Sequence, residues 1–348
     1  MTSYERVLAV LHGQEPDRVP IFELLIDPSV MKAILPGAHY PDFVEAMDID
    51  VVVTNTPSKL YEEKVLDAVQ RIVVNEWGVV RQYGVQVVSM PLDGPIKKVE
   101  DLESYKPPDP HAERRFEELQ VLLHRFKGKR FVGMHLHDGF SYPCYLRGMQ
   151  RLMMDLFENP DLVHKLVRLS VDHNIVIAER AIALGADFII LGDDYGSIEA
   201  PLISPGHFRE FFLPAIREIV EAVHGKGAFC FKHCCGNINL ILDDMVGSGI
   251  DALHPFDATA GMDIVTVKQR FPRLTVMGGV DCGAVLTDYP VAAVINEVKR
   301  LLRDVSPGGR YVISSTNTIH HTVRSENYLA MLSTVKEFGR YPVTALQV

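Results

Sequence analysis

The chain has 348 residues, and 35 Lys and Arg against 45 Asp and Glu give it a formal net charge of -10. This acidic balance argues against a nucleic-acid binder, which needs a basic face, and against adhesion to an anionic membrane. Hydrophobic residues make up 47% of the chain and charged residues 23%, as in globular proteins, which excludes disordered and fibrous classes.

The sequence shows no feature of membrane insertion or secretion. No apolar run approaches the roughly 20 residues that span a bilayer, and the first residues lack the apolar core of a signal peptide. We therefore expect a cytoplasmic protein. The five cysteines, an odd number with an adjacent pair at 234 and 235, make a poor disulfide framework. Reduced thiols that bind a metal fit this pattern better.

The first third of the chain predicts two strands and an insertion. Val19 to Leu24 and Val51 to Thr54 are typical of buried strands, with a helix expected at Asp42 to Met47 between them. Residues 71–90 alternate in hydropathy and carry a glycine at each expected bend. This pattern predicts an antiparallel hairpin inserted between elements of the main fold.

From about residue 130 onward, β-branched runs alternate with amphipathic stretches, which predicts parallel strands joined by helices. The six strands expected there are Phe131 to His137, Asp187 to Gly192, Phe229 to His233, Ile250 to Pro255, Leu274 to Gly279 and Tyr311 to Ser315. The helices expected are residues 145–157, 160–184, 205–224, 238–247, 262–271, 290–304 and 325–338. With the two earlier strands the count is eight. We therefore expect an α/β fold, a (β/α)8 TIM barrel with an N-terminal extension and an inserted hairpin, in one domain over residues 1–348.

In such barrels the chemistry lies where strands end and the following loops begin. In Phe231-Lys-His233-Cys-Cys235-Gly, residues 233 and 235 share one face of an extended chain, while Cys234 faces the other way. Imidazole and thiolate are zinc ligands, and catalytic zinc sites keep one position open for water or substrate. We expect His233 and Cys235 to bind a metal, with Cys282, after a different strand, as the third ligand. The alternative is that these cysteines are buried packing residues.

Further polar residues at strand ends are candidates for catalysis and substrate binding. Asp193, Asp194 and His135 are the candidate catalytic residues, because carboxylates and imidazoles transfer protons or bind metals. His137, which shares a strand face with His135, is a candidate substrate ligand, as are Glu23 and Asn317. Simpler roles remain open: an aspartate that caps a turn, a histidine that packs, and a solvated glutamate.

At these residues the chain resembles the uroporphyrinogen decarboxylase superfamily, in particular its cobalamin-dependent methyltransferase branch. The resemblance covers most of the chain. It rests on the runs Pro16-Asp-Arg-Val-Pro20, Asn75-Glu-Trp-Gly78, Ser204-Pro-x-x-Phe208-Arg-Glu, His233-x-Cys235-Gly-Asn, Gly278-Gly-Val-Asp-Cys282 and Gly308-Gly-Arg-Tyr-Val-Ile. The decarboxylases hold substrate carboxylates with an arginine-rich N-terminal segment. Here the residues after Pro20 are Ile-Phe-Glu-Leu-Leu-Ile, so the resemblance does not imply porphyrinogen decarboxylation.

The methyltransferase relatives are similar in their His-x-Cys pair, which implies zinc and a partner corrinoid protein that supplies the cobalamin. The thiol-methylating members carry a last cysteine after the final strand, where this chain has Ser315-Thr-Asn317. We therefore favour relatives that take a methyl group from a small donor such as a methoxyarene and pass it to cobalt. The alternatives are transfer from a methyl-corrinoid to tetrahydrofolate or a thiol, a metal-free decarboxylase, and a protein that only docks corrinoid partners. The resemblance also implies a homodimer.

Overall fold

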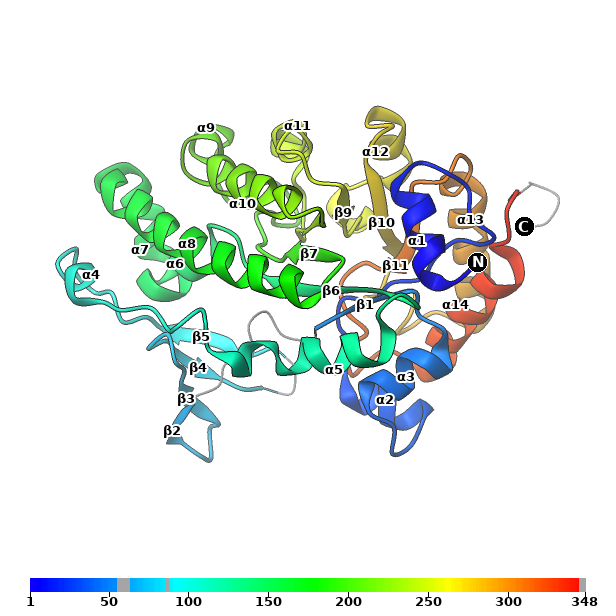
Figure 1. Cartoon of the computed structure of the whole chain (residues 1–348), viewed down its shortest axis with the longest axis horizontal. Helices are drawn as coiled ribbons and strands as arrows, with labels where there is room; N and C mark the ends of the chain where they lie inside the picture. Colours follow the sequence, from blue (N-terminus) through cyan, green and yellow to red (C-terminus); the bar gives the residue numbers. More distant parts are fainter. Residues whose placement is uncertain (55–62, 85–87, 344–348) are drawn as a thin grey trace.

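A computed structural model describes residues 1–54, 63–84 and 88–343. At its centre lies a sheet of seven parallel strands that curls through the molecule (Figure 1). In spatial order the strands are β1 (Val51–Val53), β6 (Phe131–Leu136), β7 (Phe188–Leu191), β8 (Phe229–His233), β9 (Ala252–His254), β10 (Thr275–Val280) and β11 (Tyr311–Ser315).

Residues 20–22 bond to both edges of this sheet and provide the expected eighth strand position. The N–H of Phe22 donates to the carbonyl oxygen of Ile313 in β11 at 3.0 Å. The N–H of Ile313 donates to the carbonyl oxygen of Pro20 at 3.0 Å. On the other side, the N–H of Val51 in β1 donates to Ile21 at 3.2 Å. The strand predicted at Val19 to Leu24 is thus reduced to two bridges, and the TIM-barrel-like fold is confirmed.

Helices surround the sheet (Figure 1). They are α1 (Ser3–Leu11), α2 (Pro28–Ile34), α3 (Tyr40–Met47), α4 (Asp101–Ser104), α5 (Glu117–Phe126), α6 (Ser141–Arg147), α7 (Met149–Glu158), α8 (Pro160–Leu184), α9 (Pro205–His207), α10 (Leu213–Gly225), α11 (Leu242–Val246), α12 (Ile264–Arg270), α13 (Val291–Val305) and α14 (Ser325–Phe338). The hydroxyl of Ser204 accepts from the N–H of His207 and caps α9, as its sequence predicts. The helix expected at 145–157 is split into α6 and α7, because Gly148 takes a φ of 84° that continues neither helix.

The predicted hairpin is the centre of a larger antiparallel sheet. Its four strands, in order, are β2 (Lys64–Asp67), β3 (Ile72–Val74), β4 (Val80–Gln82) and β5 (Met90–Asp93). This sheet follows β1, so it extends from the end of the barrel where the parallel strands finish. It packs on α6 through Gly94, where an added Cβ would lie 2.2 Å from the carbonyl oxygen of Leu146.

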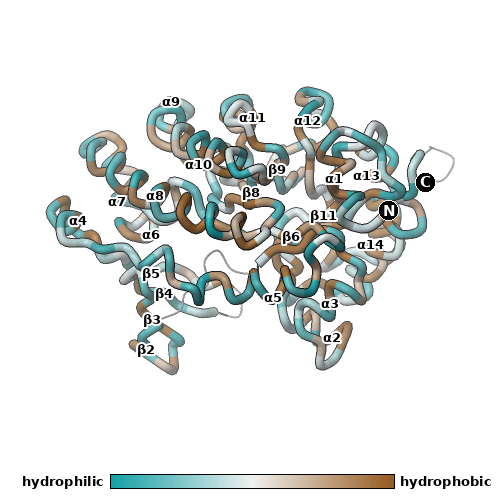
Figure 2. Tube along the Cα trace, viewed as in Figure 1, coloured by the Kyte–Doolittle hydropathy of each residue, from teal (hydrophilic) through white to brown (hydrophobic). Residues whose placement is uncertain are grey.

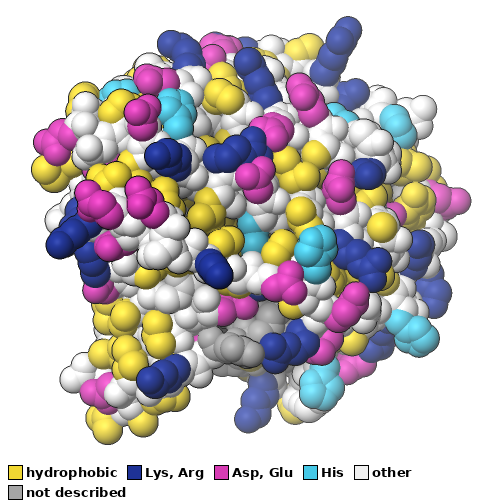
Figure 3. Space-filling view, turned by 60° about the vertical axis from the view of Figure 1, so that its left-hand side comes forward, with side chains coloured by type: hydrophobic (Ala, Val, Ile, Leu, Met, Phe, Trp, Pro, Cys, Tyr) yellow, Lys and Arg dark blue, Asp and Glu magenta, His cyan; other side chains and the backbone are white. Residues whose placement is uncertain are grey.

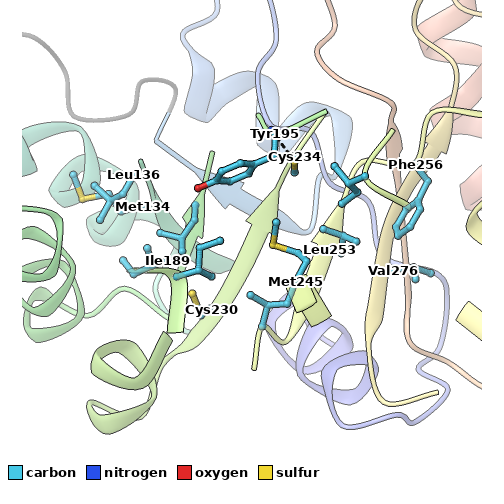
Figure 4. Packing of buried hydrophobic residues seen from close by; sticks show 14 of the residues in the cluster. Met134, Leu136, Ile189, Tyr195, Cys230, Cys234, Met245, Leu253, Phe256 and Val276 are labelled. Carbon is cyan, nitrogen blue, oxygen red and sulfur yellow. Dashed lines mark hydrogen bonds between the residues drawn. The ribbon is translucent and has the colours of Figure 1, made fainter. Parts of the chain in front are cut away.

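The core has two layers, separated by the strands. The barrel interior is filled by side chains such as Phe22, Phe131, Phe188 and Phe231. The larger layer lies between the strands and the helices, and Figure 4 shows part of it. Hydrophobic stretches accordingly follow the central strands in Figure 2, and hydrophilic ones the outer turns.

On the face in Figure 3, basic and acidic side chains are interspersed rather than gathered into one patch. Among the described residues, no helix is both long and apolar enough to cross a bilayer.

Candidate metal centre and active site

Three ligand types converge where β7 and β8 end. The ligand atoms of Asp194, His233 and Cys235 all lie within 4.8 Å of one another. Nε2 of His233 is 3.2 Å from Sγ of Cys235 and 3.6 Å from Oδ1 of Asp194. A nitrogen, a sulfur and an oxygen ligand at this separation match the donor sets of zinc sites, so these residues fit a metal ion.

A chain of hydrogen bonds fixes the tautomer of His233. Nε2 of His254 lies 3.2 Å from the carbonyl oxygen of Ser315, which only accepts, so His254 carries its proton on Nε2. Nδ1 of His254 therefore accepts from Nδ1 of His233 at 2.7 Å. Burial and Lys232 lower the pKa of His233 to about 3, so the ring is neutral. Its Nε2 is then left with a lone pair that faces the thiol and the carboxylate.

Cys234 and Cys282 are not part of this group of converging ligand atoms. Cys234 points into the layer behind the strands, where its sulfur accepts from the N–H of Tyr195 at 3.2 Å (Figure 4). Cys282 is buried against Thr316, whose hydroxyl lies 3.5 Å from its sulfur. The structure thus places Asp194 beside His233 and Cys235, whereas Cys282 is not one of the three residues whose ligand atoms meet there.

Asn317 reaches the candidate metal centre from the loop after β11. Its Nδ2 donates to the sulfur of Cys235 at 3.2 Å. Burial and the carboxylate of Asp194 raise the pKa of the Cys235 thiol well above its usual range when no metal is bound. Metal binding must therefore displace the proton of this thiol.

Two histidines point into the barrel beside the cluster. Nδ1 of His137 donates to Oδ1 of Asp193 at 2.7 Å. His135 is buried, and its Nε2 has no hydrogen-bond partner among the described residues. Gly192 makes room for this ring, because a Cβ there would lie 1.9 Å from Nε2 of His135. Burial, with His137 and His233 nearby, lowers the pKa of His135 well below its usual range, so this imidazole is neutral.

Asp193 organises the turn rather than facing the interior. Its Oδ2 accepts from the N–H groups of Asp138, Phe140 and Ser141 at 2.8 to 3.1 Å. Burial alone would raise the pKa of Asp193, but His137, the side chain of Asp138 and the charge of Lys232 hold it well below the usual range. The carboxylate stays ionised and keeps Nδ1 of His137 protonated, which leaves Nε2 of that ring for a substrate.

Glu23 lies behind the strands, away from the candidate metal centre. Its neighbours Phe22 and Leu24 fill the barrel interior, so its own side chain faces the helices. It accepts from the hydroxyl of Ser315 at 2.5 Å, and burial raises its pKa to about 8. The structure therefore buries Glu23 as a neutral acid, and a role in substrate binding stays a prediction.

The sequence analysis did not assign roles to two residues that support the site. His254 orients His233 through a hydrogen bond. The sequence signal for His254 is strand alternation, because Ala252, two residues earlier, faces the barrel interior and His254 must face the same way. Lys232 pairs with Asp138 at 2.8 Å on the opposite face of β8, and both side chains are fully buried. The alternation of side chains along β8 also predicts that Lys232 faces the opposite way from His233. Nothing in the sequence, however, pairs Lys232 with Asp138.

The chain is similar to several known proteins. The family model described as uroporphyrinogen decarboxylase (URO-D) matches residues 2–338. A methylcobamide:CoM methyltransferase from Methanosarcina acetivorans is 24% identical over 216 residues, which are 61% of this chain and 62% of that relative. A uroporphyrinogen decarboxylase from Alkalilimnicola ehrlichii is 25% identical over 268 residues, which are 71% of this chain and 68% of that relative.

Among solved structures, a methyltransferase from Methanosarcina mazei superposes with a TM-score of 0.77 at 21% identity. The match covers 97% of this chain and 99% of that one, so the two share their fold throughout. The whole-length family match is independent of this superposition. From it we conclude that the chain belongs to the uroporphyrinogen decarboxylase family.

Proposed function

We propose that this protein is a zinc-dependent methyltransferase that works with a corrinoid protein. It would take a methyl group from a small donor, with methoxyarenes favoured, and pass it to the cobalt of the corrinoid. The observation that carries the proposal is the convergence of Asp194, His233 and Cys235 at the barrel mouth. The similarity to a methylcobamide:CoM methyltransferase supports a corrinoid partner.

The residues present divide the work between binding and proton transfer. His233, Cys235 and Asp194 would hold the zinc ion, which as a Lewis acid polarises a bound oxygen. An aryl ether has a poor leaving group, since phenoxide resembles the conjugate base of tyrosine, with a pKa near 10. In its doubly protonated form, His137, oriented by Asp193, would donate a proton from Nε2 to that oxygen. His135 is neutral, so it would bind the oxygen by a hydrogen bond rather than act as an acid.

The alternative of porphyrinogen decarboxylation has less support from the residues. The segment after Pro20 offers no cation, and Phe22 and Leu24 from it fill the barrel interior. A different alternative, transfer from a methyl-corrinoid to a thiol, is favoured by the similarity to a methylcobamide:CoM methyltransferase. Against it, Asn317 rather than a cysteine contacts Cys235 from the loop after β11.

The test is methyl transfer from a panel of methoxyarenes to cob(I)alamin, followed by the absorbance of methylcobalamin. Zinc-loaded protein should form methylcobalamin, and His233→Ala should not. His224→Ala is the matched control, because this partly exposed histidine binds Asp251 at 2.8 Å on the surface. Formation of a methylated thiol from methylcobalamin, with no reaction of any methoxyarene, would instead support the thiol alternative.

A further inference from the structure

One buried arginine has no acidic partner in the part of the chain that the structure describes. The arginines buried there are Arg6, Arg18, Arg81 and Arg115. Three of these form ion pairs with carboxylates at 2.5 to 2.8 Å. Arg81 is the exception, although it is only 6% exposed.

The contacts of Arg81 are all neutral. Its Nε donates to the hydroxyl of Ser89 at 2.7 Å, and its Nη2 donates to the carbonyl oxygen of the same residue at 2.6 Å. The guanidinium lies over the ring of Tyr145, 4.7 Å from its centroid. A guanidinium has five N–H donors, so three remain without a partner among the described residues. A buried cation without a counter-ion is costly, so this position is suited to binding an anion.

Arg81 lies at the end of a row of rings that leads to the candidate active site. It belongs to β4 of the antiparallel sheet, and Tyr145 belongs to α6. The ring of Tyr145 is 5.8 Å from that of His137, which in turn is 6.4 Å from that of His135. His137 binds Asp193, and the next residue, Asp194, belongs to the candidate metal centre. The row thus joins the unpaired cation to the metal ligands.

We propose that Arg81 binds the carboxylate of the methyl donor, so that the donor is a methoxylated aromatic acid. Its aromatic ring would lie against Tyr145 and His137, with the carboxylate on Arg81 and the methoxy group toward the metal ligands. A planar guanidinium matches a carboxylate with two parallel hydrogen bonds, which fixes the orientation of the acid. This inference rests on the proposed function for the methyl group, but the anion site itself does not need methyl transfer.

The test measures binding alone, by titration calorimetry on full-length protein. The probes are 4-methoxybenzoate and its neutral isostere 4-methoxybenzamide. We expect the wild type to bind the acid about 10- to 100-fold more tightly than the amide, as for one charged hydrogen-bonding group. Arg81→Gln should remove this preference, and Arg81→Lys should keep part of it.

The control is Arg71→Gln, which makes the same charge change on the same sheet. Arg71 also lies over a tyrosine ring, that of Tyr83 at 5.8 Å, but it is exposed. This variant should keep the preference for the acid. Thermal unfolding with and without 4-methoxybenzoate shows whether each variant is folded, and the acid should raise the midpoint only where Arg81 is present.

Equal affinity of the wild type for acid and amide would overturn the inference, as would an unchanged preference in Arg81→Gln. If ethanesulfonate raised the thermal unfolding midpoint more than benzoate does, the assignment of a carboxylate ligand would be contradicted. Methyl transfer from 4-methoxybenzoate at equal rates in wild type and Arg81→Gln would leave the proposed function standing and refute the role of Arg81. If the wild type preferred the acid but transferred no methyl group from any donor, the anion site at Arg81 would stand and the proposed function would be refuted.

Discussion

The two faces of β8 differ in how their polar side chains are satisfied. On the face toward the helices, Lys232 binds the carboxylate of Asp138 at 2.8 Å and the carbonyl oxygen of Asp193 at 2.6 Å. On the face toward the barrel interior, His233 meets Cys235 and Asp194, and these groups converge on one another without a cation between them. Adjacent residues of one strand thus have opposite roles.

This difference separates structural from functional polar groups. Burial and the charge of Asp193 raise the pKa of Asp138 to about 7, while Asp138 holds the pKa of Lys232 above its usual value against burial. That pair is complete within the protein, with the hydroxyl of Tyr195 as a further donor to Asp138 at 2.5 Å. The interior face, in contrast, presents a group of ligand atoms that a metal ion would complete.

The largest expected effect is on stability, from breaking the complete pair. Lys232→Met leaves the carboxylate of Asp138 buried without its cation, which should cost about 3 to 5 kcal/mol of unfolding free energy. Urea unfolding at pH 7 measures it. The control Arg168→Met removes an exposed ion pair with Glu218 and should change stability by about 0 to 1 kcal/mol. A loss below 1 kcal/mol in Lys232→Met would show that the pair contributes little to folding.

The next effect is on metal affinity, through the residue that orients His233. His254→Phe removes the acceptor for Nδ1 of His233, so we expect zinc affinity to fall by about 10- to 100-fold. Competition with a chelating dye measures it without any substrate. Ser314→Ala removes a hydroxyl 3.2 Å from Nε2 of His254 but leaves the carbonyl oxygen of Ser315 in place, and it should bind zinc as the wild type does. Equal affinity in all three proteins would refute the orienting role.

A more gradual effect concerns pH, through Glu23 on the helix-facing side. Its folded pKa of about 8 lies above its ordinary value of 4.5, so the folded state binds the proton more tightly. The stabilisation is complete below pH 4.5 and is lost as pH rises through 8, by at most about 1.4 kcal/mol per pH unit. Urea unfolding between pH 5 and 8 should show this decline in wild type and a flatter profile in Glu23→Gln. Parallel profiles would mean that Glu23 is ionised in the fold.

Much of this arrangement follows from patterns that are visible in the sequence. Strand periodicity predicts the barrel and the opposite directions of Cys234 and Cys235, because alternation is a local property of an extended chain. The neighbours of these residues are not local. Asp194 accepts from the N–H of Cys235 at 2.7 Å across 41 residues, and no spacing rule links them. The sequence analysis gave the third ligand position to Cys282 because this cysteine follows a different strand at the same end of the barrel.

Metal content of purified protein tests the central claim most directly. After incubation with zinc and removal of the excess, elemental analysis should find about one zinc ion per wild-type chain. His233→Ala, Cys235→Ala and Asp194→Ala should lose it, whereas Cys282→Ala should keep it. Zinc-free wild-type protein would contradict the account, and so would zinc that survives in Asp194→Ala but is lost in Cys282→Ala.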